Sequence, residues 1–424
     1  MVQEVGNAFV RRRKTAQSPL GSQASVQRRP IYLRIDVPLL LVTVTLAIFG
    51  LLMVYSASWD YSLRLGLPPY YFFERQLRWM ALGVGAALIL TFIKYHFWMR
   101  LAVPAMAVTI LALVVVLFVN EVRNGAVRTL LGGSIQPSEL AKLVTVIYLA
   151  VWLFSRRDQL KDISFGLIPL AGIMGILGGL IIVQPDLSAV VTICVIGGIL
   201  FFLAGGDLRQ IIILMVVAAL VGFIVVQVNP TGSERVSGFL PGLKDPTQAP
   251  YHVRRSLEAF VHGGWFGVGI GRAETKLTGL PVPPTDSIFA VVGEETGIFG
   301  VAVLVGLYVL FLWRGLDIAR RAPDALGSLL AAGLTIWIVT EAFVNMAVMV
   351  NLLPIAGNAL PFISAGGSNL LVSLSAVGIL MNVARQSTQN QEKEERTFSA
   401  VVDLRRRDRR RRVSRPFRSE SFDE

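Results

Sequence analysis

Three short segments of this chain place charged side chains beside the ends of long apolar runs. The first is Gln136-Pro137-Ser138-Glu139, with Lys142 one helical turn further on, so that Glu139 and Lys142 share a helix face. The second is Gln184-Pro185-Asp186, a tight turn between two apolar runs. The third carries Asp286, at the point where a polar loop meets an apolar run. Acids are costly near hydrocarbon, so each is a candidate functional residue.

These residue types suit a transfer reaction on a hydroxyl group of an anionic substrate. A carboxylate such as Asp286 can act as a general base on a hydroxyl, and lysine or arginine nearby suits an anionic headgroup such as a diphosphate. The sequence has three histidines and one cysteine, so a zinc site is not expected. A nucleophile elbow of the Gly-x-Ser-x-Gly type is absent from it. The glycines of GGWFGVGIG (263–271) follow no predicted strand and precede no Walker lysine, so we reject a nucleotide site.

Each candidate also has a structural alternative, which the sequence leaves open. Ser138, Asp186 and Asp286 could cap the helices that follow them by accepting a backbone N–H. Glu139 and Lys142 could form a purely structural ion pair.

The elements that must position these residues are membrane-spanning helices. The chain of 424 residues is 54% hydrophobic and 16% charged, whereas soluble domains are about 25% charged. We predict an all-α polytopic membrane protein with ten transmembrane helices, because ten apolar runs approach the length of about 20 residues that crosses a bilayer. The runs are 37–56, 77–95, 100–119, 139–155, 165–183, 187–204, 210–228, 287–313, 327–350 and 367–384.

The eighth run contains two further acids, Glu294 and Glu295, which we interpret as packing and hydrogen-bonding groups inside the bundle. A transporter is expected to place its polar groups near the bilayer midplane. The candidate residues of the three segments lie instead near one end of the apolar runs. This position favours a reaction on a substrate at one face of the membrane.

The charge pattern predicts which side of the membrane that end faces. The net charge is +12, and both tails are strongly basic. Arginines and lysines in alternate short loops fall on the same side as the tails, and ten crossings require both tails to share a side. The positive-inside rule makes that side cytoplasmic, so Asp286 is expected at the outer face.

The chain therefore divides into three parts. We predict a disordered basic cytoplasmic tail over 1–35, a membrane domain over 36–385 with a long outer loop at about 229–286, and a second disordered basic tail over 386–424. The basic tails suit contact with anionic lipids, since each basic residue near such a surface contributes about 1 kcal/mol; nucleic acid is not an expected partner. The polar N-terminus is too long for a signal peptide, so the first helix is expected to be an uncleaved anchor.

In these residues the sequence resembles the SEDS family (shape, elongation, division and sporulation), the ten-helix peptidoglycan polymerases of the FtsW and RodA type. The resemblance covers about residues 35–385, and its motifs follow one another in order. They are VYSAS (54–58), NGAVR (124–128), QPSELAK (136–142), QPDLS (184–188), FLPGLKDP (239–246), GGWFGVGIG (263–271), KLTGLPVPPTDSIFAVVGEETGIFG (276–300) and LPFISAGGSNLL (360–371).

The resemblance implies a glycosyltransferase that polymerises lipid II with inversion, at the outer face of the bacterial cytoplasmic membrane. It implies that Asp286 is the catalytic acid. It implies no certain cofactor, although Glu139 and Asp186 could orient the lysine or hold a divalent cation such as Mg or Mn. The residues it assigns to substrate binding are Glu139, Lys142, Asp186, Arg128, Lys276, Thr285, Ser364, Gly366, Gly367 and Ser368.

The expected partners are lipid II, a class B penicillin-binding transpeptidase and other division proteins. The long basic tails favour an FtsW-like role at the division septum over a RodA-like role in elongation. The sequence departs from the family pattern at Val282, Pro284 and Ala365, where Glu, His and Tyr are common. A lipid II flippase and a non-catalytic scaffold remain as alternatives from other functional classes.

Overall fold

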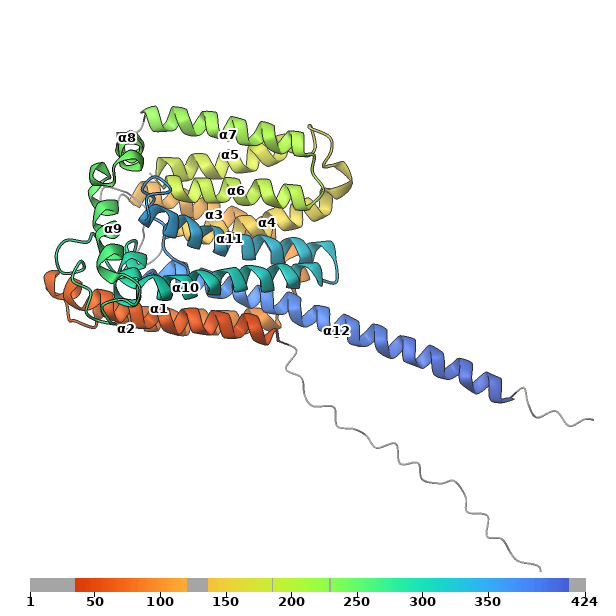
Figure 1. Cartoon of the computed structure of the whole chain (residues 1–424). Helices are drawn as coiled ribbons and strands as arrows, with labels where there is room; N and C mark the ends of the chain where they lie inside the picture. Colours follow the sequence, from red (N-terminus) through yellow and green to blue (C-terminus); the bar gives the residue numbers. More distant parts are fainter. Residues whose placement is uncertain (1–34, 120–135, 185, 229, 412–424) are drawn as a thin grey trace, which may run out of the picture. The chain divides into compact units, whose positions relative to one another are not determined.

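The computed structural model describes residues 35–119, 136–184, 186–228 and 230–411 (Figure 1). Every regular element within these ranges is a helix, as the sequence predicts. Each of the ten apolar runs coincides with a helix. The ten are α1 (Val37–Arg64), α2 (Tyr71–Phe92), α3 (Trp98–Val119), α4 (Pro137–Arg156), α5 (Leu167–Val183), α6 (Leu187–Leu203), α7 (Leu208–Val228), α10 (Ile288–Arg320), α11 (Ala325–Met349) and α12 (Gly367–Arg411).

Length and composition make this a polytopic membrane protein. Among the residues that the structure describes, seven stretches are long and apolar enough to cross a bilayer: those of α1, α3, α4, α7, α10, α11 and the first part of α12. The helices α5 and α6 are equally apolar but have only 17 residues each, which at about 1.5 Å per residue is roughly 25 Å.

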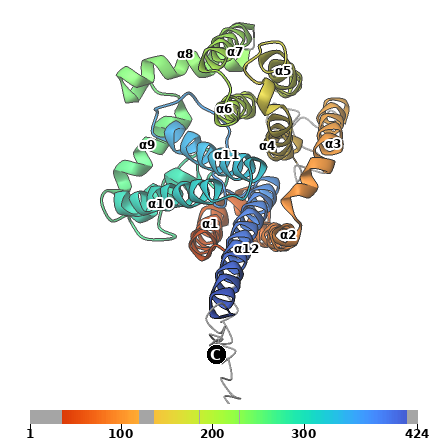
Figure 2. The same cartoon turned by 90° about the vertical axis from the view of Figure 1, so that its right-hand side faces the viewer.

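The middle of the bundle is formed by α4, α11 and α12. In the most apolar 18-residue stretch of α4, α11 and α12, 67%, 72% and 78% of the residues are buried, respectively. In the corresponding stretch of α7, no residue is buried. Seen end-on, α11 lies among α4, α6, α10 and α12 (Figure 2). A helix that is covered on all sides can carry polar side chains away from lipid, so α11 is suited to hold part of a polar site.

The helix α10 is broken at Gly297, where the sequence predicts one continuous run. Gly297 has φ 66° and ψ −171°, a conformation that is essentially restricted to glycine. The break separates a short helix, residues 288–296, from the longer part that follows. The backbone groups left unpaired there must find other partners, because unsatisfied amides are costly inside a membrane protein.

The glycine-rich segment 263–269 supplies those partners. Val268 N and Gly269 N donate to the carbonyl groups of Glu294 and Glu295 at 3.0 and 3.1 Å. In the other direction, Ile298 N and Phe299 N donate to the carbonyl groups of residues 264 and 265 at 2.9 and 3.2 Å. The glycines that resemble a phosphate loop in the sequence therefore complete a broken helix by backbone pairing.

The predicted outer loop at 229–286 contains helices of its own. These are α8 (Pro230–Lys244), the short 3-10 turn η3 (Pro246–Gln248) and α9 (Tyr251–Gly263). The helix α9 packs on α10, with the Phe260 ring 5.4 Å from the Phe289 ring. Two further 3-10 turns, η1 (Tyr95–Phe97) and η2 (Arg157–Gln159), flank α3 and α4.

The C-terminal part differs from the sequence prediction of a disordered tail from residue 386. The helix α12 continues to Arg411, and residues 412–424 lie outside the described part of the chain. The extension is rich in Gln, Glu, Lys and Arg, which have high helix propensity. It also prolongs an existing helix, so no new helical nucleus has to form. The predicted N-terminal tail lies almost wholly outside the described residues.

Candidate functional site

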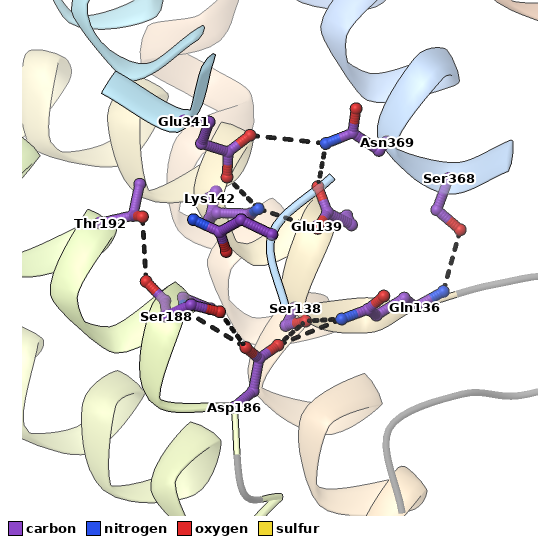
Figure 3. Close-up of polar contacts among 12 residues, drawn as sticks. Gln136, Ser138, Glu139, Lys142, Asp186, Ser188, Thr192, Glu341, Ser368 and Asn369 are labelled. Carbon is purple, nitrogen blue, oxygen red and sulfur yellow. Dashed lines mark hydrogen bonds and ion pairs between the residues drawn. The ribbon is translucent and has the colours of Figure 1, made fainter. Parts of the chain in front are cut away.

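Four helix N-termini are linked by polar contacts into one site. They are the starts of α4, α6, α10 and α12. The first and the last of these, Pro137 and Gly367, are more than 200 residues apart in the sequence. Figure 3 shows the part of this site around α4, α6 and α12. A helix N-terminus carries about half a positive charge, so their convergence favours an anionic ligand.

Asp186 joins the starts of α4 and α6. Its Oδ1 accepts from Ala189 N at 3.3 Å, so it is the N-cap of α6, and this predicted alternative is confirmed. Its Oδ2 accepts from Ser138 Oγ at 2.9 Å and from Gln136 Nε2 at 3.1 Å. Ser138 is therefore a donor to Asp186, and its predicted role as a helix cap is wrong: the N-cap of α4 is Gln136, which makes no side-chain cap.

Lys142 lies in a cluster with two acids, which we call the acid–lysine cluster: Glu139, Lys142, Glu341 and Asn369. Lys142 Nζ is 2.8 Å from Glu139 Oε1, which confirms the predicted ion pair, and it also contacts Glu341 Oε1 directly. Asn369 Nδ2 donates to Glu139 Oε2 at 2.9 Å. Lys142 is 2% exposed and Glu341 1% exposed, so the lysine charge is shared between two buried carboxylates.

Glu341 belongs to the site, although none of the sequence motifs contains it. The signal was present, because Glu341 is an acid inside the apolar run at 327–350. Only the packing of α11 against α4 shows that its partner is Lys142.

The start of α12 joins the acid–lysine cluster to the segment that carries Asp286. At one end, Ser368 Oγ accepts from Gln136 N at 2.9 Å. At the other, Ser364 Oγ donates to the carbonyl group of Thr285 at 2.8 Å. Ser364 and Ser368, both predicted as substrate-binding residues, therefore connect the start of α4 to the segment that carries Asp286.

The predicted glycines Gly366 and Gly367 shape this turn. Gly366 O accepts from Leu370 N at 2.9 Å in the first turn of α12. A Cβ atom on Gly367 would overlap the indole ring of Trp79. The close approach of α2 therefore requires a residue without a side chain at position 367.

Asp286 lies in an irregular segment, half-buried, directly before α10. The N-cap position of α10 is Ser287, so the alternative that Asp286 is the cap is wrong. The carbonyl groups of Pro284, Thr285 and Asp286 each accept a hydrogen bond from a different donor. The donors are Ala365 N at 2.8 Å, Ser364 Oγ at 2.8 Å and Asn345 Nδ2 at 3.1 Å.

Contacts from α9 support the same segment from another direction. His252 Nε2 lies 2.5 Å from Ser287 Oγ, and Ser287 Oγ also donates to the carbonyl group of Pro281. Burial lowers the pKa of His252 below its usual value of 6.5, which favours the neutral imidazole.

Lys276 is buried in a separate set of contacts. Its Nζ is 2.8 Å from Glu295 Oε1, 3.1 Å from both oxygens of Ser56 and 3.0 Å from the carbonyl group of Gly271. At 4% exposure it connects α1, the outer loop and the broken helix α10. Arg128, the other predicted basic residue, lies outside the described residues.

Glu294 acts as the sequence analysis predicts, as a hydrogen-bonding group inside the bundle. It accepts from Glu274 N at 2.9 Å and Thr275 N at 3.2 Å, and Thr275 Oγ1 also donates to it. The described residues contain no group of three or more Asp, Glu, His or Cys side chains arranged to hold a metal ion. Glu139 and Asp186, which the sequence analysis considers for a divalent cation, bind different partners.

The fold and the site together define a helical membrane protein with a polar site at four converging helix ends. The family model of the FtsW, RodA and SpoVE type, described as a cell cycle protein, matches residues 37–389. The chain belongs to this family, as the sequence motifs predict.

Similar proteins agree with this assignment. The chain is 39% identical over 367 residues to a probable peptidoglycan glycosyltransferase FtsW of Trichlorobacter lovleyi, covering 85% of this chain and 96% of the relative. It is 36% identical to stage V sporulation protein E of Bacillus subtilis, covering 83% and 97% of the two chains. Within the family the chain is therefore FtsW-like.

Two solved structures share the fold. The rod shape determining protein RodA of Thermus thermophilus matches with a TM-score of 0.63 and 26% identity, over 84% of this chain and 99% of that chain. A chain from a peptidoglycan synthase complex, described as coordinating polymerization and crosslinking, matches with a TM-score of 0.68 and 27% identity, over 84% and 100%.

Proposed function

We propose that this peptidoglycan glycosyltransferase polymerises lipid II at the outer face of the cytoplasmic membrane, with Asp286 as its general base. The observation that carries the proposal is the position of Asp286. It is half-buried, and its own carbonyl group and the two before it are held by hydrogen bonds. It directly precedes the N-terminus of α10, and hydrogen bonds link its segment through the start of α12 to those of α4 and α6. The names of the FtsW relatives support the reaction.

The proposal includes ten transmembrane helices with both termini in the cytoplasm. The ten helices that match the apolar runs support this count. The basic end of α10, with Arg314, Arg320 and Arg321, supports the orientation because Lys and Arg concentrate on the cytoplasmic side. In that orientation the start of α10, and with it Asp286, faces outward.

In the reaction, the 4-hydroxyl oxygen of an acceptor GlcNAc attacks C1 of a donor MurNAc. Asp286 takes the hydroxyl proton as the new C1–O bond forms. The bond from C1 to the diphosphate oxygen breaks with its electron pair, so undecaprenyl diphosphate leaves and the configuration at C1 inverts. A positioned base of this kind contributes about 10²–10⁴-fold to the rate.

Charge on the leaving diphosphate is stabilised by the converging helix N-termini. Lys142 is less suited to this role than the sequence suggests, because it is paired with two buried carboxylates. Its role in the proposal is to hold Glu139 and Glu341 together and so fix the start of α4 against α11. Arg128 remains a candidate contact for the diphosphate.

The proposal also places the protein at the division septum with a transpeptidase partner of the class B penicillin-binding type. The FtsW names of its relatives support the division role. The structural neighbour from a peptidoglycan synthase complex supports a partner that crosslinks the product.

The test is polymerisation of lipid II by the purified full chain in liposomes, alone and with its transpeptidase. We expect glycan strands from the wild type and none above background from Asp286→Asn. The matched control is Asp245→Asn, the same change in the same outer segment, where Asp245 starts η3 and asparagine is also a good cap. Transport of lipid II across the bilayer without glycan formation would instead identify a flippase.

A further inference from the structure

Asn345 on α11 makes contacts that neither the sequence motifs nor the proposed reaction explains. It is 1% exposed. Its Nδ2 donates to the carbonyl group of Asp286 at 3.1 Å and to that of Asn358 at 2.6 Å. One buried amide group therefore ties the segment of the catalytic acid to the loop between α11 and α12.

The segment that carries Asp286 depends on such contacts because no regular helix holds it. Of the three bonds to the carbonyl groups of residues 284–286, two come from Ser364 and Ala365, which themselves lie in a loop. The third comes from Asn345, which belongs to a helix in the middle of the bundle. Of these three donors, Asn345 is the one that belongs to a regular helix.

Asn345 also fixes the spacing between Asp286 and the acid–lysine cluster. Glu341 precedes it by four residues, so the two side chains share one face of α11 about 6 Å apart along the axis. Glu341 binds Lys142, and Asn345 binds the backbone of Asp286. A single helical turn of α11 therefore sets the distance between the two parts of the site.

The two ends of the Asn345 amide group differ in their contacts. Asn345 Oδ1 is buried and has no hydrogen-bond partner among the described residues. The Nδ2 group of the same amide satisfies two backbone carbonyl groups, which an apolar side chain of similar size would leave without this donor. A role in positioning explains why a donor stands at this place.

We propose that Asn345 is a positioning residue for the general base, which holds the carbonyl group of Asp286 so that its carboxyl group meets the acceptor hydroxyl. The inference rests on the proposed function of Asp286. Without the Nδ2 donor, the carbonyl groups of Asp286 and Asn358 lose their tie to α11, and the segment 281–287 shifts. A displacement of about 1 Å at a reacting group can lower the rate about 100-fold.

The experiment measures kcat and KM for lipid II with Asn345→Ala and Asn345→Leu in the full chain. We expect kcat to fall about 10- to 100-fold, with KM within about threefold of wild type. The leucine variant fills nearly the same volume without a donor, so it keeps the measurement available if the alanine variant folds poorly.

The matched control is Asn382→Ala on α12. Asn382 is also a buried asparagine that bridges backbone groups, accepting from Tyr95 N at 2.9 Å and donating to the carbonyl group of Thr91 at 2.8 Å. It lies away from Asp286, so we expect its loss to lower the melting temperature but to leave kcat within about threefold. Wild-type kcat in both Asn345 variants would overturn the proposal. So would failure of both to fold while Asn382→Ala folds, because Asn345 would then be purely structural.

The result can be separated from a failure of the proposed function. If Asp286→Asn polymerises lipid II at the wild-type rate, the assignment of the base is wrong whatever Asn345 does. If Asp286→Asn is inactive and the Asn345 variants are fully active, only the positioning role is wrong.

Discussion

The acid–lysine cluster and the Asp286 segment use acids in opposite ways. In the cluster, Glu139 and Glu341 are buried, carried by regular helices and paired with Lys142. Asp286 is half-buried, lies outside a helix, and is held through the backbone carbonyl groups of its segment. The paired acids hold helices together, whereas the half-buried acid outside a helix is the one we propose as the general base.

The largest expected difference between the two regions is in catalysis. Replacement Asp286→Asn should lower the rate of lipid II polymerisation about 10²–10⁴-fold, because it removes the proposed general base. Its melting temperature in detergent should stay close to that of the wild type, because asparagine has nearly the same shape as aspartate and leaves the hydrogen bonds to the carbonyl groups of residues 284–286 in place. A large loss of stability in Asp286→Asn would remove the distinction between the regions.

For the acid–lysine cluster we expect the reverse, a large effect on stability. Replacement Lys142→Met leaves two buried carboxylates without their partner, and breaking a buried ion pair in this way costs about 3–5 kcal/mol. The double change Lys142→Met with Glu341→Gln should recover part of the loss, which thermal unfolding in detergent would measure. The exposed Lys244→Met is the control and should be close to neutral.

A smaller effect is expected from the broken helix that leads away from Asp286. Replacement Gly297→Ala should destabilise the protein by about 1–3 kcal/mol, because its backbone conformation is open essentially to glycine alone. The added Cβ would also overlap the backbone of Trp265 and Gly267. Gly306→Ala in the same helix meets nothing within contact distance and should be neutral or slightly stabilising. Equal melting temperatures of the two variants would contradict this account.

The smallest effect concerns pH and the support of the Asp286 segment by α9. Burial lowers the pKa of His252 in the folded protein, so the unfolded chain binds a proton more readily. The contribution of the neutral imidazole is therefore fully present above about pH 6.5 and is lost as the pH falls below that value towards the folded-state pKa. Melting temperatures between pH 5 and 8 should show a steeper acid decline for the wild type than for His252→Gln. Parallel curves would show that His252 does not titrate in this way.

Much of the fold follows from local sequence. Each apolar run forms a helix, because a run of that composition can satisfy its backbone in lipid only by pairing with itself. The ion pair of Glu139 and Lys142 was likewise predictable, since residues three apart on a helix are neighbours. The motif at 263–271 was visible, but the sequence could not show that it pairs with a break in a helix about 30 residues later.

The sequence by itself determined the helices, the candidate acids and the family to which the chain belongs. These three features depend on composition and on residue spacing over a few helical turns, and both can be read from the sequence. Tertiary structure alone decided that Glu341 shares Lys142 with Glu139, that Gly297 interrupts α10, and that Asn345 holds the backbone of Asp286. These contacts join residues between 26 and 199 positions apart. They depend on the packing of α4, α10, α11 and α12 against one another and against the segment 263–269.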